Sequence, residues 1–348
     1  MKVLVTGAAG FIGGRVVDVL RESGHDVVAA DVLLDTAHPA DASLPAGVQR
    51  LDVRDADGLD RLLPGVDLVC HQAAMVGNGV DAQDLPGYAG HNDLGTAVLL
   101  AAMARAGTRL LVLASSMVVY GEGRYVCPEH GDVLPLERTP EDLNAGVFDP
   151  RCPVCKSVTG WATVGEDAPI RPRSSYAVSK VAQEQYAAAW ARLEGGHCVA
   201  LRYHNVYGPR MPADTPYSGV AAVFRSALER GEPPKVFEDG GQMRDFVHVD
   251  DVARANLASV QRVAEHPVGF SAYNVCSGRP RSVGQVAEAL AGAVGGARPE
   301  VTGEHRPADV RHVVASPDAA VEGLGFTAEV APEDGLRGFA DAPLRPTR

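Results

Sequence analysis

A glycine-rich turn close to the N-terminus constrains this chain more than any other feature. The apolar run Val3–Val5 leads into Gly7-Ala8-Ala9-Gly10-Phe11-Ile12-Gly13, and a helical pattern then extends from Phe11 to Ser23. Glycines at this spacing allow a tight turn and let the backbone approach a pyrophosphate, which then lies at the helix N-terminus. A strand, a glycine turn and a helix in this order predict a dinucleotide-binding βαβ unit.

The next predicted strand, Asp26–Ala30, leads to a carboxylate at Asp31, 18 residues past Gly13. A carboxylate there can bind the ribose hydroxyls of adenosine and would repel a 2′-phosphate, which favours NAD over NADP. A structural turn with a solvated Asp31 is the alternative. Other predicted strand ends place further residues near the cofactor: Asp52 and Val53 at the adenine, and Ala73 and Ala74 where small side chains permit close approach.

Strands and helices alternate through the first half of the chain. The strands Val66–Cys70 and Arg109–Ala114 flank a helix over Leu94–Ala106, and the helix Ser175–Glu194 precedes the strand Val199–Arg202. Such alternation predicts an α/β Rossmann fold with a doubly wound parallel sheet. We expect a cofactor domain over residues 1–205, interrupted by an insertion at 123–160, and a smaller α/β substrate-binding domain over 206–348, of which 242–265 return to the first domain.

Bulk properties exclude several classes of protein. The net charge is −12 and no run of basic residues is present, so we expect no nucleic-acid partner. No apolar stretch approaches the ~20 residues that span a bilayer. The N-terminus lacks the charged start and long apolar core of a signal peptide. We therefore expect a cytoplasmic protein with no membrane partner.

Tyr176 and Lys180 are four residues apart in a predicted helix and so share one face. A free tyrosine has a pKa near ~10, and a neighbouring ammonium group favours the phenolate and lowers that pKa. Ser116 ends a predicted strand at the carboxyl edge of the sheet, where such folds bind ligands. These three residues are our predicted catalytic group; the alternative for Tyr176 and Lys180 is a surface pair.

Longer segments carry a family resemblance. Ala114–Gly121, Leu201–Arg210 and Arg244–Asp251, together with the glycine turn, resemble the extended short-chain dehydrogenases/reductases of the NAD-dependent sugar epimerase/dehydratase family. The resemblance implies NAD as cofactor, a nucleotide sugar as substrate and a homodimer. It implies that Ser116 is the catalytic serine and that Ser115, Asn92, Tyr176, Lys180 and Tyr203 lie at the cofactor. It places Ser116, Asn205, Tyr217, Arg244, Arg306 and Asp309 at the substrate, with the arginines on its diphosphate.

Two apolar residues after Ser116 argue against one reaction of this family, the dehydration of the sugar. The 4,6-dehydratases of this family carry an Asp-Glu pair after the catalytic residue, whereas this chain has Met117 and Val118, which cannot transfer protons. We therefore expect a 4-epimerase: Tyr176 takes the proton of the sugar 4-hydroxyl while C4 gives hydride to NAD, and the 4-keto sugar is reduced again on its opposite face.

The identity of the sugar is suggested by a narrower likeness. Tyr120–Gly123, Thr215–Val220, Phe237–Gly240 and Asp309–His312 resemble the dTDP-L-rhamnose 4-epimerase group, which also carries an insertion after the first of these segments. UDP-glucose or UDP-glucuronate 4-epimerase is the nearest alternative. A nucleotide-sugar reductase or dehydrogenase is another, and a non-enzymatic redox-sensing regulator is a third.

Four residues in the insertion form a metal-ligand pattern. Cys127 and His130 are separated by two residues, as are Cys152 and Cys155, with 21 residues between the two pairs. Two close pairs of such ligands suit tetrahedral zinc, and four protein ligands leave no open position, so the zinc would be structural. Free thiols in a mobile loop are the alternative. Cys70, Cys198 and Cys276 lie in apolar runs and are expected in the core.

Overall fold

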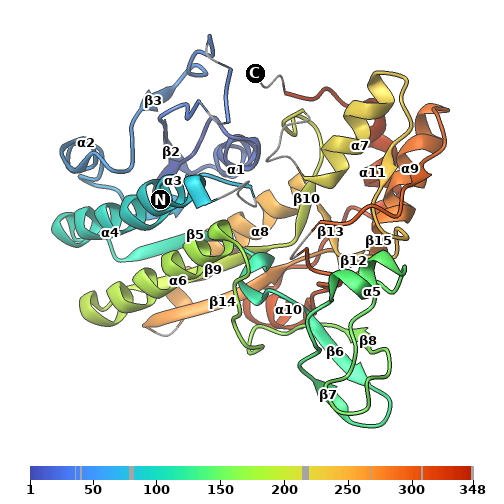
Figure 1. Cartoon of the computed structure of the whole chain (residues 1–348). Helices are drawn as coiled ribbons and strands as arrows, with labels where there is room; N and C mark the ends of the chain where they lie inside the picture. The colour runs from blue at the N-terminus through green and yellow to red at the C-terminus, as the bar shows by residue number, and fades with distance from the viewer. Residues whose placement is uncertain are drawn as a thin grey trace.

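A computed structural model describes residues 1–35, 37–39, 41–77, 82–213, 219–266, 268–306 and 309–345. Its centre is a seven-stranded sheet with the order β14-β9-β5-β4-β1-β2-β3 (Figure 1). All neighbouring strands in it are parallel. The strands are β1 (Lys2–Thr6), β2 (Asp26–Asp31), β3 (Val48–Arg50), β4 (Leu68–His71), β5 (Leu110–Ser116), β9 (His197–Tyr203) and β14 (Gly269–Val275). This order confirms the predicted Rossmann fold, and the order reverses between β1 and β4, where such sheets bind ligands.

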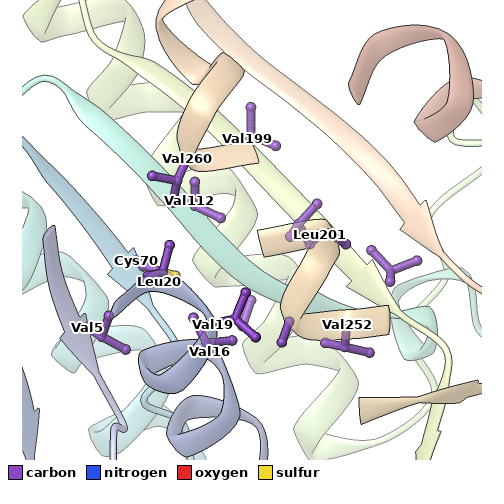
Figure 2. Packing of buried hydrophobic residues seen from close by; sticks show 14 of the residues in the cluster. Val5, Val16, Val19, Leu20, Cys70, Val112, Val199, Leu201, Val252 and Val260 are labelled. Carbon is purple, nitrogen blue, oxygen red and sulfur yellow. The ribbon is translucent and has the colours of Figure 1, made fainter. Parts of the chain in front are cut away.

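Helices cover both faces of the sheet because alternate strand residues point to opposite sides. On one face, Val5, Val112 and Val199 pack with apolar residues of two helices, α1 (Phe11–Glu22) and α8 (Val249–Arg262) (Figure 2). A short helix, α10 (Asp318–Leu324), joins this core. The opposite face packs against α2 (Ala56–Leu62), α4 (Gly95–Ala106) and α6 (Ser175–Glu194).

A second core lies to one side of the sheet. Buried apolar residues of α7 (Val220–Glu229), α9 (Val283–Val294) and α11 (Pro332–Asp341) form it. Three two-stranded sheets belong to this region: β10 (Asn205–Tyr207) with β13 (Phe246–His248), β11 (Lys235–Val236) with β16 (Glu300–Val301), and β12 (Met243–Arg244) with β15 (Arg281–Ser282). The chain returns to the central sheet over a longer span than the expected 242–265, because β14 and α10 also pack there.

The insertion has secondary structure of its own and projects from the body of the protein (Figure 1). A three-stranded antiparallel sheet places β6 (Arg124–Cys127) between β7 (Gly131–Val133) and β8 (Gly160–Ala162). The sequence showed no periodicity here because each strand has at most four residues. The remaining short elements of the chain are η1 (Ala82–Asp84), α3 (Leu85–Tyr88), η2 (Ala89–Leu94), η3 (Met117–Tyr120), α5 (Pro140–Asn144) and η4 (Val263–Glu265).

The outer surface of α6 carries an apolar face. Val178, Tyr186 and Leu193 are exposed, and their spacing of eight and seven residues places them on the same side of the helix. Such a face is compatible with the expected homodimer, which stays a prediction. Among the described helices, none combines the length and apolar character needed to cross a membrane.

Candidate functional site

The glycine turn packs backbone against backbone at the carboxyl edge of the sheet. Gly7 has a φ of +69°, and a Cβ there would lie 2.7 Å from the amide nitrogen of Ala73. A Cβ on Gly13 would lie 2.0 Å from the carbonyl oxygen of Gly7. Gly10 precedes α1, whose first turn begins with Phe11 and Ile12 and holds no acidic residue. The first N–H groups of a helix have no partner within the helix, so the start of α1 is suited to bind a phosphate.

Asp31 lies beside that turn. Its carboxylate is buried and accepts hydrogen bonds from the backbone N–H of Ala9 (2.9 Å) and of Leu33 (2.8 Å). Asp52 is engaged differently, because its carboxylate forms an ion pair with Arg54 at 2.6 Å, and the hydrogen bond from Arg54 lowers the pKa of Asp52. Val53 is buried beside it. Asp31 is thus at the turn, whereas the predicted adenine contact of Asp52 and Val53 stays a prediction.

The predicted catalytic residues come together between β5 and α6. Helix α6 begins after Ser174, whose hydroxyl accepts a hydrogen bond from Ala177 N–H and so fixes the first turn. Lys180 Nζ donates to the carbonyl oxygen of Ala114 at 2.9 Å and lies 5.8 Å from the centroid of the Tyr176 ring. Ser116 ends β5, and its hydroxyl lies close enough to Tyr176 to act on the pKa of the phenol. One serine, one phenol and one amine therefore share a single site.

Burial controls the protonation of this group. It raises the pKa of Tyr176 well above its usual value, although the nearby hydroxyl of Ser116 acts in the opposite direction. Burial also lowers the pKa of Lys180 to about 7. We expected the ammonium group of Lys180 to lower the pKa of Tyr176; in the protein alone, desolvation is the largest effect and raises it. Desolvation penalises the phenolate, and Lys180 carries only part of its charge at neutral pH.

Three residues predicted at the cofactor form hydrogen bonds that join the elements around the site. Asn92 is fully buried in the π-helix η2; its side chain bonds both backbone groups of Met75 and donates to Ser179 Oγ at 2.8 Å. The hydroxyl of Ser115 donates to Glu184 at 2.5 Å. The Tyr203 hydroxyl bonds Gln72 and Asn256. Their side chains therefore hold the strand ends and α6 in place, and direct contact with the cofactor stays a prediction.

Sequence reasoning did not identify Glu184 as part of this support. Its carboxylate is buried and also pairs with Arg202, at 2.9 Å. Arg202 in turn donates to the Tyr120 hydroxyl at 3.0 Å. A buried carboxylate requires such partners. The spacing of Glu184, four residues after Lys180 on the same helix face, was the signal that could have revealed it.

Of the described residues predicted at the substrate, Arg244 has the surroundings best suited to binding an anion. Its guanidinium donates to the carbonyl oxygens of Met243 (2.9 Å), Arg311 (2.8 Å) and Val310 (2.6 Å). No carboxylate within the described ranges forms a salt bridge with it, and burial lowers its pKa while Asp309 raises it in part. A half-buried cation whose hydrogen-bond partners among the described residues are all neutral carbonyls favours a bound anion.

The other residues predicted at the substrate are more exposed or lie elsewhere. Asn205 has a buried side-chain oxygen with no hydrogen-bond partner among the described residues. The guanidinium of Arg306 lies over the ring of Phe237, at 5.0 Å from its centroid, and Asp309 is exposed. Tyr217 lies outside the described residues. The structure thus brings Arg244 and Asp309 into one neighbourhood, and substrate contacts for this set stay predictions.

The four cysteine and histidine residues of the insertion converge, and we call them the Cys/His cluster. One ligand atom of each lies within 4.8 Å of the other three. Cys127 Sγ is 3.5 Å from both His130 Nδ1 and Cys155 Sγ, and Cys152 Sγ is 3.7 Å from His130 Nδ1. Zn–S bonds of roughly 2.3 Å in a tetrahedron separate two sulfurs by about 3.8 Å. The spacing of the cluster therefore fits a tetrahedral metal ion.

The two halves of the cluster lie on separate turns. Cys127 and Gly131 pair at the end of the β6–β7 hairpin, so that Cys127 and His130 face each other across its turn. The second turn is closed by an isolated bridge between Arg151 and Val158, and the N–H of Cys152 bonds the Ser157 carbonyl at 2.8 Å. Each turn thus presents two ligands from a fixed backbone.

Comparison with known proteins gives one consistent family. Residues 3–141 and 155–276 match the NAD dependent epimerase/dehydratase family. The dTDP-L-rhamnose 4-epimerase of Burkholderia thailandensis is 31% identical over 345 residues, covering 96% of this chain and 93% of that protein. The UDP-glucose 4-epimerase of Mycolicibacterium smegmatis is 34% identical over 344 residues, covering 97% and 96%.

Solved structures agree with this family. MoeE5 in complex with UDP-glucuronic acid and NAD is 31% identical, covers 98% of each chain and has a TM-score of 0.76. The Thermus thermophilus UDP-glucose 4-epimerase in complex with NAD is 32% identical, with 98% coverage of each chain and a TM-score of 0.75.

A methyl group on Gly13 should abolish cofactor binding while the same change on Gly14 should not. The Cβ of Gly13→Ala would overlap the backbone of Gly7, whereas at Gly14 it would lie 3.4 Å from the nearest atom, an ordinary contact. Alanine in a helix interior also stabilises by about 1 kcal/mol relative to glycine. We expect purified Gly13→Ala to hold little NAD and Gly14→Ala to hold the wild-type amount, as measured by absorbance after acid release. Equal NAD content in both variants would contradict this placement of the cofactor.

Proposed function

The chain belongs to the NAD dependent epimerase/dehydratase family, and on that premise we propose that it is an NAD-dependent nucleotide-sugar 4-epimerase. The observation that carries the proposal is the grouping of Ser116, Tyr176 and Lys180 at the carboxyl end of β5. This grouping lies at the same edge of the sheet as the glycine turn. A sugar hydroxyl held there would meet a proton acceptor and the cofactor together.

The residues at the glycine turn suit NAD. Gly7 and Gly13 leave no room for side chains, the start of α1 offers free N–H groups, and Asp31 places a carboxylate beside the turn. NAD, when bound, supplies the hydride chemistry by taking a hydride from the sugar and returning it. The protein's own contribution is to bind the sugar, to orient its 4-hydroxyl and to move one proton.

Tyr176 is the proton-transfer residue in this account. Its phenol oxygen receives the proton of the sugar 4-hydroxyl and later gives it back, while Ser116 hydrogen-bonds the same sugar oxygen. Because burial holds the proton on Tyr176 in the protein alone, binding of ligands has to lower this pKa before the transfer. Lys180, when charged, stabilises the phenolate. Its hydrogen bond to Ala114 fixes the position of that charge.

The two residues after Ser116 favour epimerisation over dehydration of the sugar. Met117 and Val118 begin η3 at this edge, and neither side chain can donate or accept a proton. Loss of water from the sugar would need such a group. The same site also suits a reductase or dehydrogenase that releases an oxidised or reduced product. A regulator without catalysis would not need the three residues that this chain holds together.

For the substrate we propose a nucleotide-diphosphate hexose, with dTDP-L-rhamnose as the first candidate. Arg244 supports a diphosphate because it is a half-buried cation whose hydrogen-bond partners within the described ranges are carbonyl oxygens. The B. thailandensis relative named dTDP-L-rhamnose 4-epimerase supports the sugar. UDP-glucose and UDP-glucuronate are the alternative substrates, because other relatives are named UDP-glucose 4-epimerase and UDP-glucuronate 4-epimerase.

We further propose that the Cys/His cluster holds a structural zinc ion. Its three thiol groups and one imidazole are ligands that zinc prefers, and their spacing fits a tetrahedron. Four protein ligands leave no position for a substrate, so the ion would order the insertion and take no part in catalysis. Thiol ligands of this kind persist in a reducing compartment, which supports a cytoplasmic setting.

Replacement of Tyr176 by Phe should remove epimerase activity without removing the cofactor. The variant lacks the oxygen that exchanges the proton, and general acid–base groups of this kind contribute about 10²–10⁴-fold to rate. We expect kcat to fall by at least two orders of magnitude at unchanged NAD content. Tyr186→Phe is the matched control, since Tyr186 is exposed on the same helix. A Tyr176→Phe enzyme with near wild-type kcat would refute the assignment.

Elemental analysis should find about one zinc ion per chain in protein prepared without chelator. Cys152→Ser should lose the ion, because the hydroxyl of serine is a poor zinc ligand. Cys198→Ser, in a buried strand away from the insertion, should retain it. Absence of zinc from the wild-type protein, or equal zinc in the two variants, would contradict the proposal.

A further inference from the structure

The insertion makes ion pairs with the substrate side of the protein through the stretch between the two halves of the Cys/His cluster. Arg138 Nη1 donates to Glu238 Oε1 at 2.6 Å, and its Nη2 donates to the backbone carbonyl of Asp309. Asp149 Oδ1 accepts from Arg311 Nε at 2.8 Å and lies 3.0 Å from His312 Nε2. Two residues of the insertion therefore hold the segment 309–312 from one side.

The pair of Arg138 with Glu238 and the guanidinium of Arg311 are buried, whereas the Asp149 side chain is 40% exposed. The side chains of Arg138, Glu238 and Arg311 are 6%, 3% and 2% exposed. The guanidinium of Arg311 is shared by Asp149, Glu238 and Asp239, each at 2.8 Å. Removing one member of a buried ionic cluster leaves charge without compensation. Loss of Arg138 or Asp149 would therefore weaken the hold on segment 309–312 from the side of the insertion.

Arg244 lies on the other side of the same segment. Its guanidinium bonds the carbonyl oxygens of Val310 and Arg311, and the Met243 N–H donates to His312 Nδ1 at 3.0 Å. The backbone of Val310 and Arg311 therefore separates the insertion from Arg244. A displacement of this segment would remove the acceptors that hold the guanidinium and change where its charge lies.

The Cys/His cluster closes the stretch that carries Arg138 and Asp149. The 21 residues between His130 and Cys152 include both, and Asp149 is three residues from Cys152. Closing a loop of this length with a metal ion removes conformational freedom that the open loop would keep. The family match omits residues 142–154. Cys152 and Asp149 therefore lie in a segment outside the matched family sequence.

We propose that the insertion, closed by a metal ion at the Cys/His cluster, positions the segment 309–312 and Arg244 to bind the nucleotide diphosphate of the substrate. This inference rests on the proposed function, since it assumes a nucleotide-sugar ligand. Arg138 and Asp149 act as positioning residues through segment 309–312. Metal loading then sets the affinity for the substrate nucleotide and leaves NAD binding at the glycine turn unchanged.

Arg138→Met and Asp149→Asn test this inference in the full-length, NAD-loaded and zinc-loaded protein. The probes are UDP and dTDP, with dissociation constants measured by titration calorimetry. We expect Kd for the preferred probe to rise at least about tenfold in both variants, with KM rising similarly and kcat, NAD content and zinc content unchanged. Asp132→Asn is the matched control, because Asp132 forms an exposed ion pair with Arg124 in the same insertion.

Chelator-treated wild-type protein provides a second measurement that needs no substitution. We expect the same rise in Kd, retention of NAD, and recovery of affinity on adding zinc. Wild-type Kd in Arg138→Met or in the metal-free protein would overturn the inference while leaving the proposed function intact. If wild-type protein binds neither UDP nor dTDP, the proposed function fails and this inference fails with it.

Discussion

The close approach of the glycine turn to the end of β4 determines where everything else in the site can lie. Gly13 packs onto the carbonyl of Gly7, and Gly7 packs onto the backbone of Ala73, so neither glycine has room for a side chain. This contact fixes the start of α1 over the point where the strand order reverses. β5 continues the parallel sheet beyond β4 and brings Ser116 to the same edge. A cofactor at the turn and a sugar at Ser116 would thus be neighbours.

Burial gives the catalytic group its chemical character. Tyr176 and Lys180 lie on α6 against the end of β5, and desolvation disfavours the charged form of both. A phenol that keeps its proton until ligands arrive suits a reaction in which the proton leaves and returns within one turnover. The buried pair of Glu184 and Arg202 keeps α6 against β5 and β9, so the position of Lys180 depends on a salt bridge that takes no part in the chemistry.

Sequence patterns predicted the sheet and the catalytic group because both depend on local spacing. The alternation of strands and helices indicated a Rossmann fold, and the four-residue spacing of Tyr176 and Lys180 placed them on one helix face. The protonation of Tyr176 could not be predicted, since it depends on burial by residues distant in sequence. The ion pairs of Arg138 and Asp149 were missed for the same reason, because their partners lie 100 and 162 residues away. The return of β14 to the sheet was missed because Ser271 and Asn274 interrupt the apolar residues of 269–275.

The central claim is that the sugar is oxidised and reduced again at C4 within one site. The most direct measurement incubates the enzyme with C4-deuterated dTDP-L-rhamnose, UDP-glucose and UDP-glucuronate in ordinary water and follows products by NMR and NADH by absorbance. The account predicts a 4-epimer that keeps its deuterium at C4, the highest kcat/KM for dTDP-L-rhamnose, and no net NADH. Accumulation of NADH, loss of deuterium to water, or no 4-epimer from any of the three sugars would contradict it.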